Sequence, residues 1–169
     1  TLFPYTTLFR SETYGGGGND VSTGVEIAKE AAQYDMKVLL DFHYSDFWAE
    51  PAVQLVPKAW KKDVNNTEKM CSDVYDFTKE SIQKFKDAGA NIGMVQVGNE
   101  ITNGLLGIYS NRDKGESFNV IWGDKKKSTE VNKYLKAGIK AVREYTPQAL
   151  VALHLETPNV WKYKTIMNT

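Results

Sequence analysis

The feature that most constrains the fold is a regular alternation of helical and strand patterns along the chain. Apolar residues recur at helical spacing in three stretches, at about residues 21–34, 67–88 and 129–145. Each stretch precedes a short apolar run of strand length, at residues 37–42 (KVLLDF), 92–97 (IGMVQV) and 150–153 (LVAL). Runs that are apolar at consecutive positions are typical of strands buried on both faces. The alternation therefore predicts an α/β fold with a parallel sheet and helical crossovers.

Capping residues mark where the helices begin and end. Asn19-Asp20 and Asn66 are good N-caps for the first two helices, and Gly89 suits a left-handed stop after the second. Two long connections remain, at residues 43–65 and 102–128, and for both we predict no regular element. The glycines at 15–18 follow no strand pattern and are expected to form a turn rather than a phosphate-binding loop.

Charge and composition exclude several classes of protein. The chain has 21 basic and 21 acidic residues, so it lacks the basic excess of a nucleic-acid binder. It contains no apolar run of the length needed to span a membrane. Cys71 is the single cysteine, which excludes an intrachain disulfide scaffold.

Polar side chains follow each of the three predicted strands. In chain order they are Asp41, His43 and Asp46 with Trp48 close behind, then Gln96, Asn99 and Glu100, then His154 and Glu156. The carboxyl ends of parallel strands meet at one edge of a sheet, and this edge is the active face of an α/β barrel. Each residue alone has a structural explanation, such as capping a helix or bracing a loop, but the repetition at three strands favours a functional cluster.

Two kinds of chemistry fit such a cluster. In glycoside hydrolysis, one carboxyl donates a proton to the leaving oxygen and a second attacks the sugar or activates water. Asn99-Glu100 would supply the acid and an amide for a sugar hydroxyl, while Trp48 and Trp60 would stack on sugar faces. The alternative is a Zn or Mn site, whose plausible ligands are Asp41, His43, Glu100, His154 and Glu156. The second interpretation is weaker because no common metal-binding spacing is present.

Several segments resemble glycoside hydrolase family 53, the endo-β-1,4-galactanases. The longest are residues 37–51 (KVLLDFHYSDFWAEP) and 92–102 (IGMVQVGNEIT), and shorter ones are residues 14–20 (YGGGGND), 57–60 (PKAW) and 150–158 (LVALHLETP). These segments occur in the family's order, and the resemblance extends over about residues 13–160.

The resemblance implies part of a (β/α)8 TIM barrel, about strands three to five with their flanking helices. It makes Glu100 the general acid/base and Asn99 its sugar-binding neighbour. The other substrate-binding residues that we expect are His43, Asp46, Trp48, Asp41 and His154.

The resemblance also implies what the enzyme acts on. The expected substrate is β-1,4-galactan, the type I arabinogalactan side chain of pectin, cleaved internally with retention of configuration. No cofactor is expected for the chemistry, and the calcium that some bacterial members bind belongs to a later loop. The whole protein is expected to be secreted, since its substrate is a large polymer. It is also expected to be a monomer with no nucleic-acid or membrane partner.

The chain departs from the family pattern at both ends. Residues 1–11 lack the expected Arg-x-Trp element, although they contain Arg10, and we expect them to be a non-native or disordered leader before a barrel segment at residues 12–169. The family's nucleophile, a Glu after strand seven, is expected beyond Thr169, and Glu156 does not take that role. We therefore expect the isolated chain to be inactive. The remaining alternatives are another polysaccharidase of the same clan, a metal-dependent barrel enzyme, and a non-catalytic carbohydrate-binding protein.

Overall fold

The computed structural model describes residues 19–111, 114–157 and 159–169. Three parallel strands form its sheet: β1 (Lys37–Phe42), β2 (Asn91–Val97) and β5 (Leu150–Ala152). The strand β2 lies between the other two, with Asp41 opposite Gln96 and Gln96 opposite Ala152. The predicted parallel α/β sheet is confirmed within these residues. The expectations for residues 1–11 and 15–18 lie outside them.

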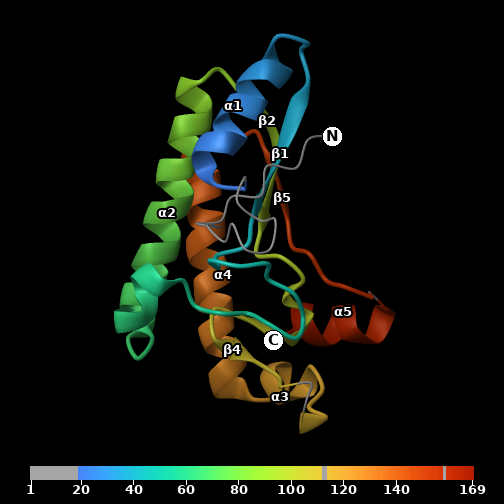
Figure 1. Cartoon of the computed structure of the whole chain (residues 1–169). Coiled ribbons are helices and arrows are strands. Elements are labelled where there is room, and N and C mark those ends of the chain that lie inside the picture. The colour runs from blue at the N-terminus through green and yellow to red at the C-terminus, as the bar shows by residue number, and fades with distance from the viewer. Residues whose placement is uncertain (1–18, 112–113, 158) are drawn as a thin grey trace.

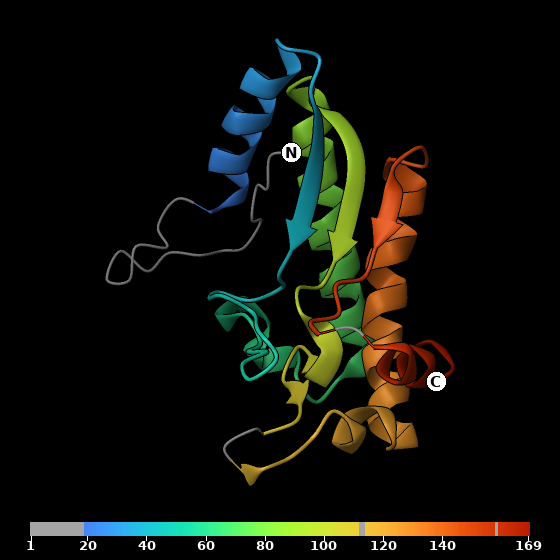
Figure 2. The ribbon, with the colours of Figure 1, turned by 90° about the vertical axis from the view of Figure 1, so that its right-hand side faces the viewer.

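Three long helices cover one face of this sheet (Figures 1 and 2). They are α1 (Val21–Ala32), α2 (Thr67–Asp87) and α4 (Lys125–Tyr145). Asp20 and Asn66 cap the first two as predicted, by accepting hydrogen bonds from the backbone N–H groups of Thr23 and Lys69. A sheet of successive parallel strands, each joined to the next by a helix on its outer face, is an arc of a (β/α) barrel.

The core lies between the sheet and the helices. Val38, Leu40 and Phe42 of β1 and Val95 and Val97 of β2 are buried there. Side chains alternate along a strand, so the intervening residues point to the opposite face. That face carries Asp41 and Gln96 near the carboxyl ends of their strands. It also carries Leu150, the first residue of β5, which is 63% exposed. In a barrel this face lines the interior.

The two long connections contain short elements that the sequence pattern did not predict. The first holds the 3₁₀ helix η2 (Lys58–Asp63). The second holds the 3₁₀ helix η3 (Ile101–Asn103), the hairpin of β3 (Gly104–Leu105) and β4 (Ile108–Tyr109), and the short helix α3 (Asn119–Trp122). The last helix, α5 (Val160–Met167), lies beside α3, where Trp161 packs edge-on against Phe118.

The helix α4 begins four residues earlier than predicted. Asp124 accepts hydrogen bonds from the backbone N–H groups of Lys126 and Lys127, so it caps a helix whose first turn is polar. The prediction of Thr129 was wrong because it relied on the apolar spacing, which begins only at Val131.

Candidate active site

The candidate site lies at the carboxyl ends of the three parallel strands. Asp41 and His43 come from the end of β1, Gln96 and the Asn99-Glu100 pair from the end of β2, and His154 from the segment after β5. Asp41, His43 and Asn99 are each more than nine-tenths buried. Segments distant in the sequence therefore bring polar side chains together where a barrel fold places its chemistry.

Gln96 joins the ends of the first two strands through its side-chain amide. Its Nε2 atom donates to Asp41 Oδ1 across the strand pair and to Asn99 Oδ1 at 3.1 Å. Because Asp41 and Gln96 are register partners, the pairing of β1 with β2 sets this geometry. Gln96 thus fixes both a buried carboxylate and the amide beside Glu100.

The backbone of Ala49 closes these contacts into a ring of interactions that runs through Ala49, His43, Asp41, Gln96 and Asn99. Its N–H donates to His43 Nδ1 at 3.1 Å, and its carbonyl accepts from Asn99 Nδ2 at 2.8 Å. Since Nδ1 accepts, His43 carries its proton on Nε2, which lies 3.4 Å from Asp41 Oδ2. The ring ties the loop after β1 to both strand ends.

His154 completes the setting of the Asn99 amide. The Nδ1 atom of His154 lies 2.7 Å from Asn99 Oδ1. An amide oxygen only accepts hydrogen bonds, so His154 carries a proton on Nδ1. The orientation of the amide is then fixed by two donors on its oxygen and one acceptor on its nitrogen.

Glu100 occupies a turn with unusual backbone angles. Its φ and ψ are 48° and 47°, the left-handed region, which is uncommon for a residue with a side chain. Gly98, two residues before Glu100, has φ +84°, and a Cβ atom there would lie 2.6 Å from Ile101 Cγ2. The glycine is therefore required for β2 to end in this turn.

Tyr44 anchors the segment beneath His43. Its hydroxyl is 2.8 Å from Thr78 Oγ1, which itself donates to the Val74 carbonyl at 2.7 Å. Complete burial raises the pKa of the Tyr44 phenol well above its ordinary value, and the nearby Asp41 charge acts in the same direction. The phenol therefore stays neutral and holds the loop against α2.

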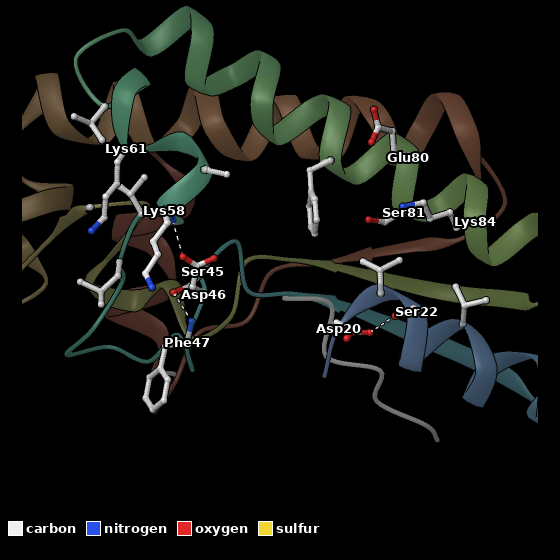
Figure 3. A pocket seen from close by; sticks show the side chains of 18 of the residues that line it. Asp20, Ser22, Ser45, Asp46, Phe47, Lys58, Lys61, Glu80, Ser81 and Lys84 are labelled. Atoms are coloured by element: carbon white, nitrogen blue, oxygen red, sulfur yellow. Dashed lines mark hydrogen bonds between the residues drawn. The ribbon is translucent and has the colours of Figure 1, made fainter. Parts of the chain in front are cut away.

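Asp46 lies apart from the hydrogen-bond ring. Its Oδ2 atom accepts from the backbone N–H of Lys58 at 2.6 Å, which braces the loop. It also lines a groove between α1, α2 and the segment 45–64 (Figure 3). Asp46 therefore has a structural role in the loop, separate from the contacts of Asn99.

The two tryptophans of the first loop occupy different environments. Trp48 is 42% exposed and meets the His43 ring edge-on, with centroids 5.5 Å apart. Trp60 is only 9% exposed and packs against Tyr44 and Phe77. The hypothesis that Trp60 stacks on a sugar is wrong, because the core covers its ring.

The ligand set considered for a metal does not assemble within residues 19–111, 114–157 and 159–169. No three His, Cys, Asp or Glu side chains there are grouped so that they could hold an ion. Glu156 instead has its Oε2 atom 3.8 Å from Lys162 Nζ. In the same ranges, no helix is long and apolar enough to cross a membrane.

One residue of the site, Gln54, was not singled out from the sequence. It is 1% exposed, and its side-chain amide contacts the carbonyls of Asn99 and Glu100. A lone Gln in a loop has no periodicity or motif that would indicate its burial.

The chain is similar to galactan-degrading enzymes. The model of glycosyl hydrolase family 53 matches residues 4–169. The chain is 43% identical over 157 residues to the endo-beta-1,4-galactanase of Bacillus subtilis (strain 168), covering 92% of this chain and 32% of that protein. It is 38% identical over 90 residues to the arabinogalactan endo-beta-1,4-galactanase of Humicola insolens, covering 53% of this chain and 26% of that protein.

Solved structures of family 53 enzymes are also similar to this chain. The Ignisphaera aggregans GH53 catalytic domain matches with a TM-score of 0.76 and 31% identity, over 99% of this chain and 42% of that one. A fungal beta-1,4-galactanase structure matches with a TM-score of 0.71 and 26% identity, over 95% of this chain and 45% of that one. The fold is therefore part of a TIM barrel, as predicted. On the family match and these structures together, the chain belongs to glycosyl hydrolase family 53.

Proposed function

We propose that the whole protein carrying this segment cleaves internal linkages of β-1,4-galactan with retention of configuration. The observation that carries the proposal is the Asn99-Glu100 pair at the end of the central strand, with its amide held by Gln96 and His154. The printed names of the relatives, endo-β-1,4-galactanases, support the choice of substrate.

Glu100 is the proposed general acid/base. It donates a proton to the leaving glycosidic oxygen and then removes a proton from the water that releases the sugar. Within the described ranges, Glu100 is the one carboxyl that the family pattern marks for catalysis. The second carboxyl, the nucleophile, is expected beyond Thr169, about 5–5.5 Å from the first in the active enzyme. A chain without this second carboxyl is then expected to be inactive.

The proposed sugar contacts come from both loops and strand ends. Asn99 and His154 face the reacting sugar from the central and third strands, and Trp48 offers an exposed ring beside His43. Asp41 and Asp46 complete the predicted cleft. Asp41 belongs to the ring of interactions with His43 and Gln96, and Asp46 belongs to the loop that it braces. The chemistry uses no cofactor, and the enzyme acts as a monomer outside the cell on a polymeric substrate.

The test is a substrate panel with a stereochemical readout. The whole protein is incubated with β-1,4-galactan, xylan and mannan, and the products are separated by size. Proton NMR during the first turnovers identifies the anomer that forms first. Galacto-oligosaccharides appearing initially as the β-anomer support the proposal. Preferential cleavage of xylan or mannan would point to another polysaccharidase, and tight galactan binding without cleavage to a binding protein.

A further inference from the structure

Gln54 is a buried polar side chain beside Glu100 that the proposed mechanism does not use. It lies in the loop after β1 and is 1% exposed. Its Nε2 atom donates to the carbonyl of Asn99 at 2.9 Å and to that of Glu50 at 3.1 Å, with the Glu100 carbonyl at 3.4 Å. One amide nitrogen therefore faces both carbonyls that flank the Glu100 α-carbon.

The backbone of Gln54 connects the same loop to a third segment. Its carbonyl accepts from the N–H of Gly107, in the hairpin of β3 and β4, at 2.6 Å. Nearby, Asn103 Nδ2 donates to the carbonyl of Pro51 at 3.1 Å. The loop that carries Gln54 is thus held on both sides, and the position of its side-chain amide is well defined.

The turn that Gln54 contacts needs such support. A residue with a side chain in the left-handed region is strained by about 1–3 kcal/mol and keeps that conformation only where its surroundings impose it. Here the N–H of Ile101, next along the chain, donates to the carbonyl of His154 at 2.9 Å. Gln54 restrains the carbonyl side of the Glu100 turn, and the His154 carbonyl restrains the other side.

We propose that Gln54 is a positioning residue for Glu100, acting through the carbonyls of residues 99 and 100. This inference rests on the proposed role of Glu100 as the acid/base. Loss of the Gln54 amide frees the turn and displaces the Glu100 carboxyl from the leaving oxygen. A displacement of about 1 Å can reduce the rate about 100-fold.

The experiment compares substrates that differ in their need for a proton. Gln54→Met keeps the length of the side chain and removes its donors. The whole protein and this variant are assayed on a phenyl and a 2,4-dinitrophenyl β-glycoside of galactobiose. The first leaving group needs protonation by the acid and the second does not. The measured quantity is kcat/KM, which reports the step that breaks the glycosidic bond.

We expect Gln54→Met to lower kcat/KM about 10- to 100-fold on the phenyl glycoside and only slightly on the dinitrophenyl glycoside. The matched control is Gln83→Met on α2, where the exposed side-chain amide donates to Asp87 Oδ1 at 2.7 Å. That variant should match the wild type on both substrates.

The possible results separate this inference from the proposed function. An equal loss on both glycosides, or no loss, would overturn the inference alone. A wild-type protein inert on both glycosides and on galactan would overturn the proposed function and the inference with it. If Gln54→Met does not fold, the wild type provides a second test by NMR. The Gln54 side-chain amide protons should exchange with solvent more slowly than those of Gln83, and equal exchange would refute the contacts.

Discussion

The Nδ1 atom of His154 lies 2.7 Å from the Oδ1 atom of Asn99, across the boundary between β5 and β2. This contact sets which end of the Asn99 amide is available as a donor, because its oxygen already accepts from His154 and Gln96. The segment after β5 therefore contributes to the proposed acid/base region, because its His154 orients Asn99 beside Glu100.

The first prediction concerns the coupling of these two residues. His154→Phe keeps a ring of similar size and removes the donor, so it should lower galactan kcat/KM in the whole protein. Asn99→Ala should lower it further, and the double variant should lose less than the sum of the two effects. A double-mutant cycle should give a coupling of about 0.5–3 kcal/mol. Strictly additive losses would show that His154 does not act through Asn99.

The second prediction separates the two tryptophans. Trp48→Ala should raise the KM for galactan about 2- to 13-fold, as expected from the ~0.5–1.5 kcal/mol of an aromatic contact, with little change in stability. Trp60→Ala should instead lower the free energy of unfolding by about 3–5 kcal/mol, because its ring is buried against Tyr44 and Phe77. Denaturant unfolding and steady-state kinetics measure both effects. A KM unchanged by Trp48→Ala would show that Trp48 does not contact the sugar.

The third prediction concerns the contact of α4 with the sheet. A Cβ atom at Gly138 would lie 2.7 Å from Tyr44 Oη and 2.8 Å from Val97 Cγ1. Gly138→Ala gains about 1 kcal/mol of helix propensity, but overpacking of about 1–3 kcal/mol opposes it. We expect net destabilisation in urea unfolding, with the exposed Lys136→Ala as a control within about 0.5 kcal/mol of wild type. A more stable Gly138→Ala protein would contradict this packing.

The fourth prediction concerns the pH dependence of the α1 cap. The hydrogen bond from Ser22 and the backbone N–H of Thr23 lower the pKa of Asp20 below its ordinary 3.8. A lowered folded pKa adds stability above the unfolded value, and that stability is lost as the pH falls through the folded pKa. The contribution is under about 1 kcal/mol, since the site is partly exposed.

The matched variant for this cap is Asp20→Asn, which keeps an acceptor and removes the charge. Wild type should exceed the variant in stability at neutral pH, and the difference should vanish in acid below the ordinary value of 3.8. Urea unfolding at several pH values measures it. A difference that stays constant into acid would show that the charge makes no contribution.

The sequence predicted the main elements because their signals are local. Apolar spacing and the capping residues Asp20 and Asn66 located two helices, and β1 and β2 were recognised from their continuous apolar runs. These features depend on neighbours along the chain, so they are visible without the fold.

The elements that were not predicted depend on contacts between distant segments. The β3–β4 hairpin has two-residue strands, too short for any alternation, and the Gly107 N–H in its turn donates to the distant Gln54 carbonyl. A tryptophan in a loop suggests a ring that stacks on a sugar, whereas Trp60 packs against Phe77 of α2. In the site, the motif indicated Asn99 and Glu100, while the roles of Ala49 and Gln54 follow only from the packing of the loop.

The measurement that tests the central claim most directly is Glu100→Gln in the whole protein, assayed beside the wild type. Gln is close in size but cannot donate or accept the catalytic proton. We predict a loss of galactan hydrolysis on the order of 10²–10⁴-fold, with a much smaller loss of kcat/KM on the 2,4-dinitrophenyl glycoside of galactobiose. Galactan hydrolysis at the wild-type rate by Glu100→Gln would contradict the assignment of Glu100 as the acid/base.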